Sequence, residues 1–222
     1  FGTALHEVLQ HYLDVMYKES GAEADRIDIE ELFEETLRKC YADDYKKNKG
    51  KHFSSPEELR EFYEDGKAIL NNFKKKKNAH FSKKGWYLVG CELPIVMSPN
   101  LRLNNVKYMG YLDIVMYHEP TNTFKIIDIK TSTKGWGSYA KKDESKQFQL
   151  VLYKYFFSKQ YNIPIENIDI EFFIVRRKVY LGGEYPQKRI QTFVPSSGKV
   201  KVNKATTNLN EFINKAFNLD GS

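Results

Sequence analysis

An aspartate and a lysine, two residues apart, stand in a short apolar segment. Asp128 and Lys130 occupy the stretch Ile126-Ile127-Asp128-Ile129-Lys130-Thr131. Because alternate side chains of a strand face the same way, we expect Asp128 and Lys130 to share one face while Ile127 and Ile129 point to the other. An acid beside an amine on a rigid strand suits catalysis. The same spacing is also typical of an exposed ion pair on an edge strand.

Asp113 favours the catalytic interpretation. It stands inside the apolar stretch 110–115, where an unpaired charge would cost on the order of several kcal/mol, so it needs a lysine, an arginine or a metal as partner. The predicted turn at 118–122 makes the two strands antiparallel neighbours, and a symmetric turn pairs residue 113 with about residue 127. We therefore expect Asp113 and Asp128 to converge on one ion, and two carboxylates suit Mg²⁺ or Mn²⁺.

Glu92 repeats this pattern on the strand before, within the stretch 89–94. Three acids on three successive predicted strands favour a common site. The alternative is that Glu92 is an ordinary edge residue.

The elements that must position these acids follow from periodicity. Apolar residues at helical spacing predict helices over 3–17, 28–47, 144–160 and 207–217, and Ser55 followed by Pro56 signals another helix start. Segments rich in β-branched and aromatic residues predict strands over 86–97, 106–117, 123–130, 168–177 and 190–194, and segment 178–205 is loop-rich. This order predicts an α/β or α+β layer arrangement in which a helix covers a sheet.

Five motifs in chain order resemble the RecB-type branch of the PD-(D/E)XK nuclease superfamily, which includes phage and recombination exonucleases. They are a Gly and a His on an early helix, an upstream Glu, a G-x-x-D strand, a D-x-K strand and a Q-x-x-x-Y helix. The matching residues are Gly2-Thr3-Ala4-Leu5-His6, Glu92, Gly110-Tyr111-Leu112-Asp113, Asp128-Ile129-Lys130 and Gln149-Leu150-Val151-Leu152-Tyr153.

The resemblance implies a restriction-endonuclease-like core, which is a central mixed sheet flanked by helices. It implies one nuclease domain over 1–222, with a mainly helical region at 1–85, the catalytic sheet and helix at 86–195, and a C-terminal helix within 196–222. No P-loop motif is present, so a helicase activity would have to come from a partner.

The resemblance also implies the role of each residue. The metal ligands would be His6, Asp113, Asp128 and the carbonyl of Ile129. Lys130 would orient or deprotonate the attacking water, and Glu92 would hold a metal-bound water or a second ion. Gln149 and Tyr153, one helical turn apart, would contact the active-site loop and the DNA backbone. Without the motif order, His6 would be read as an ordinary structural histidine.

Basic and aromatic residues directly follow the D-x-K strand. Lys134, Trp136, Tyr139 and Lys141, together with Lys142, suit contact with DNA, because cations neutralise the backbone and rings stack on bases. The alternative for Trp136 and Tyr139 is packing against the neighbouring helix. A second basic stretch, residues 71–90, has six lysines and no acid. Its lysines also suit the solvated end of a helix.

Charge and composition narrow the class of protein. Net charge is −7 over residues 1–70 and +13 over residues 71–222, which suits a polyanionic partner or simply a lysine-rich surface.

Cys40 and Cys91 cannot form a four-cysteine zinc or iron–sulfur site; we expect two buried free thiols, with one disulfide as the alternative. No apolar run approaches the roughly 20 residues that a membrane-spanning helix needs, and no signal peptide is visible, so we expect an intracellular protein. The start at Phe1 within a helical pattern leads us to expect preceding residues.

Three functions follow as hypotheses. The first is a Mg²⁺- or Mn²⁺-dependent deoxyribonuclease, an exonuclease in recombination, repair or replication by analogy with the family, acting on single- or double-stranded DNA and working with a helicase or recombination protein. The second is a nucleic-acid-binding or assembly module that keeps the fold without catalysis. The third is a structural subunit of a repair or packaging assembly, with the acidic region 1–70 as a partner surface. RNA remains an open substrate.

Overall fold

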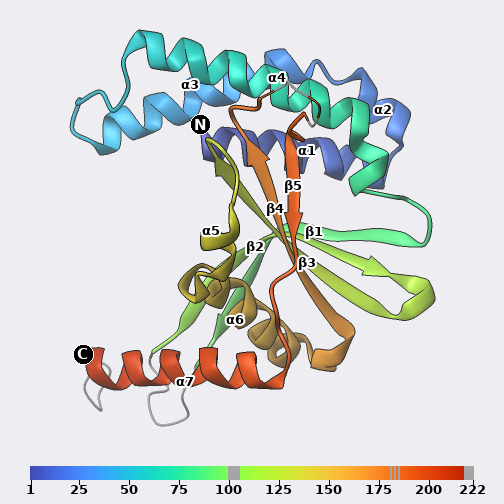
Figure 1. Cartoon of the computed structure of the whole chain (residues 1–222), viewed down its shortest axis with the longest axis vertical. Helices are drawn as coiled ribbons and strands as arrows, with labels where there is room; N and C mark the ends of the chain where they lie inside the picture. Colours follow the sequence, from blue (N-terminus) through green and yellow to red (C-terminus); the bar gives the residue numbers. More distant parts are fainter. Residues whose placement is uncertain (100–105, 181, 183, 185, 218–222) are drawn as a thin grey trace. The chain divides into compact units, whose positions relative to one another are not determined.

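The computed structural model describes residues 1–99, 106–180, 182, 184 and 186–217 (Figure 1). The chain divides into two compact units. Unit 1 comprises residues 1–88, 129–135 and 173–191, and unit 2 comprises residues 89–128, 136–172 and 192–222. The single domain expected over 1–222 stays a prediction.

Four helices make up most of unit 1: α1 (Gly2–Lys18), α2 (Gly21–Arg26), α3 (Ile29–Lys47) and α4 (Pro56–His80). Side-chain caps set where three of them begin. Ser20 accepts from Glu23 N, Asp28 accepts from two backbone amides of α3, and Ser55 forms a capping box with Glu58. These bounds agree with the predicted helices, and α2 is an addition that the short sequence GAEADR does not signal by periodicity.

The core of unit 1 forms where α1 and α4 bury their apolar faces. Tyr12 of α1 and Phe73 of α4 meet edge to face, and Phe73 and Phe81 contact Phe173. Gly66 lets α3 and α4 approach closely, because an added Cβ would lie 2.0 Å from the Phe33 ring.

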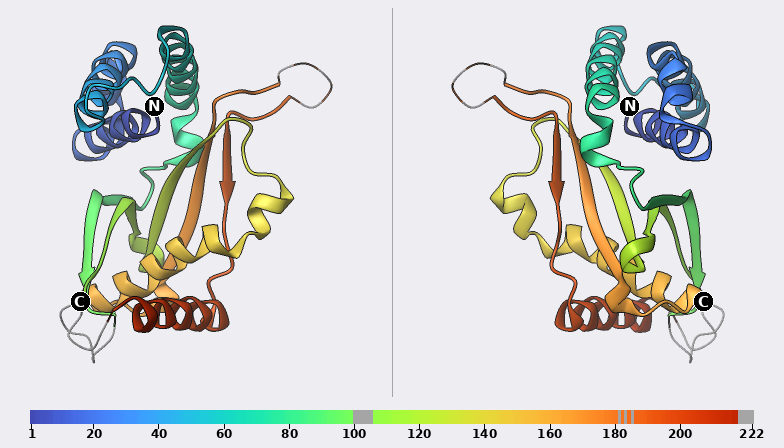
Figure 2. Two further views of the ribbon diagram at one scale, coloured as in Figure 1. Left: turned by 90° about the vertical axis from the view of Figure 1, so that its left-hand side faces the viewer. Right: turned by 90° about the vertical axis from the view of Figure 1, so that its right-hand side faces the viewer.

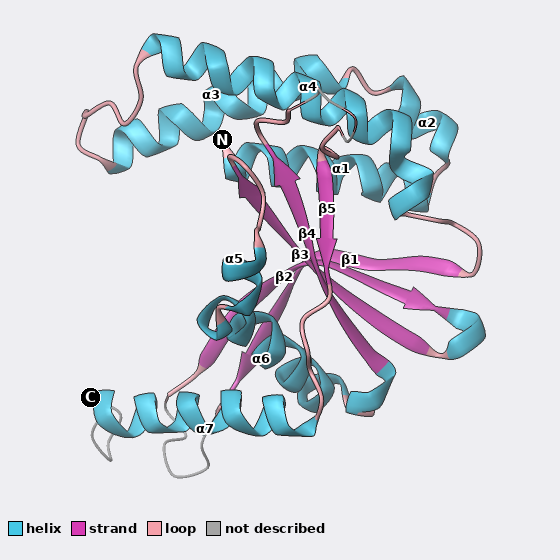
Figure 3. Cartoon of the chain, in the orientation of Figure 1, coloured by secondary structure: helices cyan, strands magenta, loops and turns pink. Residues whose placement is uncertain are grey.

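A five-stranded sheet has the order β1-β2-β3-β4-β5. The strands are β1 (Trp86–Met97), β2 (Tyr108–His118), β3 (Thr123–Ser132), β4 (Ile168–Arg176) and β5 (Ile190–Phe193). β2 and β3 are antiparallel, while the arrows of β3 and β4 point the same way in Figures 1 and 3, so the sheet is mixed. The expected α+β class with a mixed sheet flanked by helices is confirmed.

The connection between β2 and β3 fixes their register. A 3-10 turn at Glu119–Thr121 (η1) and Asn122, in the left-handed conformation, make a four-residue loop that pairs His118 with Thr123. The loop is one residue shorter than a symmetric turn centred on Pro120 would be. Every pair therefore moves by one residue from the expected register.

Three helices complete unit 2: α5 (Ser138–Lys142), α6 (Glu144–Tyr161) and α7 (Lys199–Ala216). A 3-10 turn, η2 (Ile165–Asn167), leads from α6 into β4. α6 packs on the sheet where Phe156 stacks on Tyr108 and Phe157 contacts Phe124. Figure 2 shows α7 alongside α6. Lys201 and Lys204 of α7 both bind Glu144 of α6 and lower the pKa of its carboxyl to about 2.

α7 begins eight residues before the predicted helix at 207–217. The sequence KVKVNKATTN alternates like a strand and lacks a helical apolar stripe, so the prediction was wrong for these turns. Burial of Val202 and Ala205 and the bonds to Glu144 stabilise them as helix.

Two further expectations can be compared with the structure. Cys40 and Cys91 are thiols rather than a disulfide, as expected, but both are half-buried rather than buried. Among the residues that the structure describes, no helix is both long and apolar enough to cross a membrane.

Candidate active site

Asp113 and Asp128 lie on neighbouring strands within unit 2. Ile114 pairs with Ile127, and continuing this register by one residue sets Asp113 opposite Asp128. Directly opposed residues of an antiparallel pair have Cβ atoms about 4.5–5.5 Å apart and side chains on one face. Asp128 is only 3% exposed, and Ile126 and Ile127 beside it are buried. The strand thus holds one carboxylate rigidly in the interior and presents a second one to it.

This donor set fits a hard divalent cation. Two carboxylates so close repel each other unless a cation lies between or beside them. Among the described residues, no group of three His, Cys, Asp or Glu side chains is arranged to hold a metal ion. The predicted ligand set of His6, Asp113 and Asp128 is therefore not assembled around one ion in the described residues. Mg²⁺ is commonly bound through one or two carboxylates and keeps several waters, so a pair of carboxylates is compatible with it.

Tyr153 of α6 lies in the field of all three predicted acids. Its side chain is 7% exposed, and Gln149 Nε2 donates to its hydroxyl at 3.1 Å. Burial raises the pKa of Tyr153, the Gln149 bond lowers it, and the charges of Asp128, Asp113 and Glu92 raise it. The side chains of the G-x-x-D, D-x-K and Q-x-x-x-Y motifs and Glu92 therefore share one environment.

Gly110 has a steric reason to be glycine. A Cβ added there would lie 2.6 Å from Cε1 of Tyr153. Because real Cβ atoms do not approach so closely, only glycine lets the Tyr153 ring lie on β2 three residues before Asp113. The two motif positions form one packing unit that brings α6 against the strand of Asp113.

Glu92 occupies a left-handed backbone conformation, with φ 51° inside β1. Exposure along β1 alternates before Gly90 and again after Leu93, but with opposite parity. An extra residue in one strand does this, so we interpret Glu92 as part of a β-bulge that re-aims its side chain. A non-glycine residue in this region costs about 1 kcal/mol, and such strain is concentrated at functional sites.

Unit 1 contains Lys130 and the two other predicted metal ligands, His6 and the carbonyl of Ile129. Lys130 follows Asp128 by two residues in β3, so strand geometry gives the two side chains the same face. Ile129 between them is fully buried, which anchors the strand. α1 begins against this segment, because a Cβ on Gly2 would lie 3.1 Å from Oγ1 of Thr131. His6 is one turn after Gly2 and half-buried, so α1 carries it on the face that adjoins β3.

The loop residues divide into packed and exposed groups. The ring centroids of Trp136 and Phe172 are 4.9 Å apart, and the Trp136 ring also contacts Phe193. The ammonium of Lys141 lies over the Phe193 ring at 5.6 Å. Tyr139, by contrast, is 87% exposed, and Lys134 is exposed. The geometry therefore favours a packing role for Trp136 and leaves Tyr139 and Lys134 accessible to a ligand.

The second basic stretch is partly used inside unit 1. Lys77 forms an ion pair with Asp25 at 2.7 Å, and Lys74 donates to the carbonyl of Ile27. These lysines hold α4 to the segment around α2, so they are less available to a polyanion than the sequence predicts.

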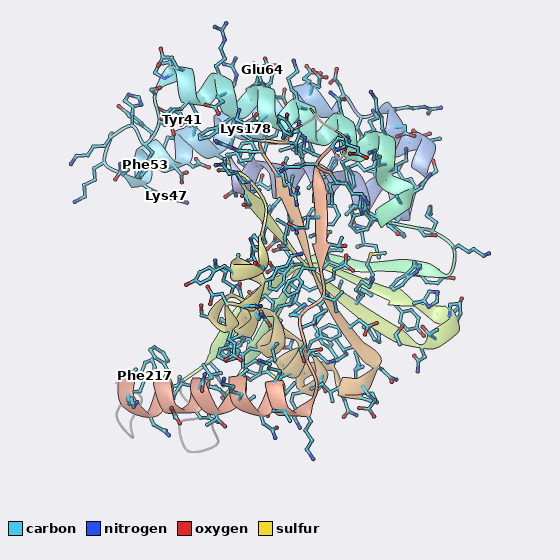
Figure 4. The ribbon with its side chains drawn as sticks, in the orientation of Figure 1. Tyr41, Lys47, Phe53, Glu64, Lys178 and Phe217 are labelled. Carbon is cyan, nitrogen blue, oxygen red and sulfur yellow. The ribbon has the colours of Figure 1, made fainter. Side chains whose placement is uncertain are left out.

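A network of hydrogen bonds and ion pairs that the sequence periodicity does not predict holds the segment after Lys130. The amides of Arg177 and Lys178 donate to the carbonyls of Ser132 and Thr133. Lys178 Nζ lies 2.9 Å from buried Asp65 of α4, a contact near the Lys178 label in Figure 4. The Arg177 guanidinium, in turn, contacts the ring of Phe62. The run Arg176-Arg177-Lys178 at a strand end was the available signal.

Comparison with known proteins agrees with this arrangement. A family model described as the PD-(D/E)XK nuclease superfamily matches residues 1–218. A comparison with curated proteins gives no match.

The contact between Gly110 and Tyr153 makes a first prediction. Gly110→Ala should lower the free energy of unfolding by about 1–3 kcal/mol, because the added methyl group overlaps the ring. In a Tyr153→Ala background the same change should cost much less. Denaturant unfolding of the four proteins measures this coupling. Gly137→Ala, where an added Cβ meets nothing within 4 Å, is the control. Equal costs in both backgrounds would show that the ring is not the obstacle.

The strained backbone at Glu92 makes a second prediction. Glu92→Gly should be more stable than Glu92→Ala by about 1 kcal/mol, because only glycine adopts this conformation without penalty. Both variants lose the carboxylate, so their difference isolates the backbone contribution. The measurement is urea unfolding at neutral pH; an alanine variant as stable as the glycine variant would contradict the assigned strain.

Proposed function

Because the chain belongs to the PD-(D/E)XK nuclease superfamily, we propose that it is a metal-dependent deoxyribonuclease that hydrolyses DNA phosphodiester bonds. The observation that carries this proposal is the register of β2 and β3, which pairs Ile114 with Ile127 directly beside Asp113 and the buried Asp128. Lys130 follows on the same strand face.

The chemistry needs an activated water and positive charge on the phosphate. Asp113 and Asp128 would hold a divalent cation, which would supply Lewis-acid polarisation of the phosphate and help to activate water. Lys130 orients the attacking water or takes its proton, and its ammonium form stabilises the charge that develops on the phosphate oxygens. The buried flanks of Asp128 keep the carboxylate in place, so little reorganisation is needed during the reaction.

The remaining motif residues support this centre. His6 and the carbonyl of Ile129 would have to move towards Asp113 and Asp128 to join them as ligands of Mg²⁺ or Mn²⁺, because no three such acidic or histidine side chains of the described residues are arranged around one ion. Glu92 would serve a water or a second ion beside them. Tyr153 and Gln149 contact the DNA backbone near the three acids. The contact of Gly2 with Thr131 supports the role of His6, because it brings the start of α1 to the end of the D-x-K strand.

We further propose that the enzyme is an exonuclease of the RecB type in DNA recombination, repair or replication, inside the cell and with a helicase or recombination protein as partner. This rests on the five-motif resemblance. Cleavage of linear DNA but not of closed circular DNA would support it, and nicking or cleavage of the circle would contradict it.

The proposed site makes a prediction for cleavage. Asp113→Asn, Asp128→Asn and Lys130→Met should each lower the rate of Mg²⁺- or Mn²⁺-dependent cleavage at least about 10²-fold, because each removes a charge that acts on the phosphate or the water. Glu92→Gly should also lose activity while gaining stability over Glu92→Ala.

Matched controls come from the same sheet. Asp169→Asn on the exposed face of β4 and Lys125→Met earlier on β3 change the same residue types away from the proposed centre. They should cleave at the wild-type rate. Near-normal turnover of the Asp128 or Lys130 variant would overturn the proposal. A folded wild-type chain that binds DNA but never cleaves it would favour the binding-module alternative.

The basic loop makes a prediction for binding. Replacing Lys134, Lys141 and Lys142 together by alanine should weaken DNA binding and flatten its salt dependence. Each lost phosphate contact reduces the slope of log K against log salt by about 0.9. The control replaces the exposed Lys46, Lys47 and Lys49 near the end of α3, the region of the Lys47 label in Figure 4. The measurement is DNA binding by fluorescence anisotropy at several salt concentrations. Equal slopes for both triple variants would show that the loop does not contact DNA.

A further inference from the structure

A cavity of about 490 Å³ lies in unit 2, where α6 faces the start of α7. Its lining includes Lys154 and Lys159 of α6, together with Ser197 and Lys199. Volumes of roughly 300–1,000 Å³ are typical of sites for small ligands. The cavity contains none of the residues assigned to the catalytic centre.

Lys154 is the unusual residue of this cavity. It is only 8% exposed, and its ammonium donates to the Ser197 hydroxyl at 3.2 Å. No carboxylate in the described part of the chain forms an ion pair with it. Burial lowers the pKa of Lys154, and the charges of Asp169 and Glu166 offset part of this effect. Because the Ser197 hydroxyl uses only one of the three donors of this buried ammonium, the site is suited to an anion.

The surroundings add positive potential. Lys159 and Lys199 also line the cavity, against one acid, Glu166. α7 is 18 residues long, its N-cap Gly198 offers no side chain to the first amides, and its first turn has no acid. The free amides and the helix dipole favour an anion at this end. The ring of Tyr155 and the side chains of Ile165 and Val202 give the same cavity an apolar wall.

We propose that this cavity binds the terminal phosphate of a nucleotide, with the phosphate on Lys154, Ser197 and Lys199 and the base on the apolar wall. The ligand class is a phosphate monoester on an aromatic body, either a free nucleoside monophosphate or the phosphorylated end of a strand. This goes beyond the proposed nuclease centre and does not depend on it.

Isothermal titration calorimetry in EDTA, with dAMP as the probe, tests the proposal. EDTA excludes binding through a divalent cation at the Asp113–Asp128 pair. We expect saturable binding of dAMP, weaker binding of inorganic phosphate and none of deoxyadenosine. Lys154→Met should weaken dAMP binding at least tenfold. Lys199→Ala, at an exposed position that the fold does not need, should weaken it severalfold. Competition by a 5′-phosphorylated oligonucleotide, against its unphosphorylated form, identifies a strand end as the source of the phosphate.

Two controls separate this site from the catalytic proposal. Lys204→Met removes a lysine of α7 that binds Glu144 and does not line the cavity, so dAMP affinity should stay unchanged. Asp128→Asn should also bind dAMP normally, whether or not it cleaves DNA. Absence of dAMP binding to the wild type, equal affinity for deoxyadenosine, or unchanged affinity in both Lys154→Met and Lys199→Ala would overturn the proposal.

Discussion

Two carboxylates held opposite each other across β2 and β3 are the constraint on which the proposed site depends. Their opposition follows from the four-residue loop at 119–122, because the loop fixes which residues pair. A slip of one residue along either strand would turn one of the two side chains to the other face of the sheet. The buried isoleucines around Asp128 oppose such a slip, because each would leave the packing that surrounds it. The apolar strand sequence therefore fixes the position of the charged groups.

Close backbone approach is the second requirement. Gly110 admits the Tyr153 ring, and Gly2 lets α1 begin against Thr131, so each glycine brings a helix to a strand that carries a motif residue. Glu92 is the opposite case, because a residue with a side chain occupies a backbone conformation that glycine adopts at lower energy. Stability alone would favour glycine at that position. The charge of Glu92 acts on Tyr153 together with those of Asp113 and Asp128, which agrees with the proposed role of Glu92.

Much of the fold could be predicted because its signals are local. The β-branched and aromatic residues of 123–130 and the capping pattern around Ser55 specify a strand and a helix without help from the rest of the chain. The first turns of α7 and the packing of Trp136 could not be predicted, because distant partners decide them: Glu144 for the helix, and Phe172 with Phe193 for the ring. The bulge at Glu92 could not be predicted either, because the sequence around it has the composition of a regular strand. The proposed catalytic residues rest on motif order, and the register between their strands depends on a loop whose length the periodicity does not reveal.

α6 contributes a residue beside the proposed catalytic acids and another to the cavity between α6 and α7. Tyr153 and Lys154 are consecutive, so about 100° of helix rotation separates their directions. One packs on Gly110 beside the acids, and the other donates to Ser197 at the cavity. Neither contact tolerates a large rotation of the helix, because the ring has no spare room at Gly110 and the ammonium has no other described partner. The orientation of α6 is therefore set by both contacts, which lie on different faces of the helix.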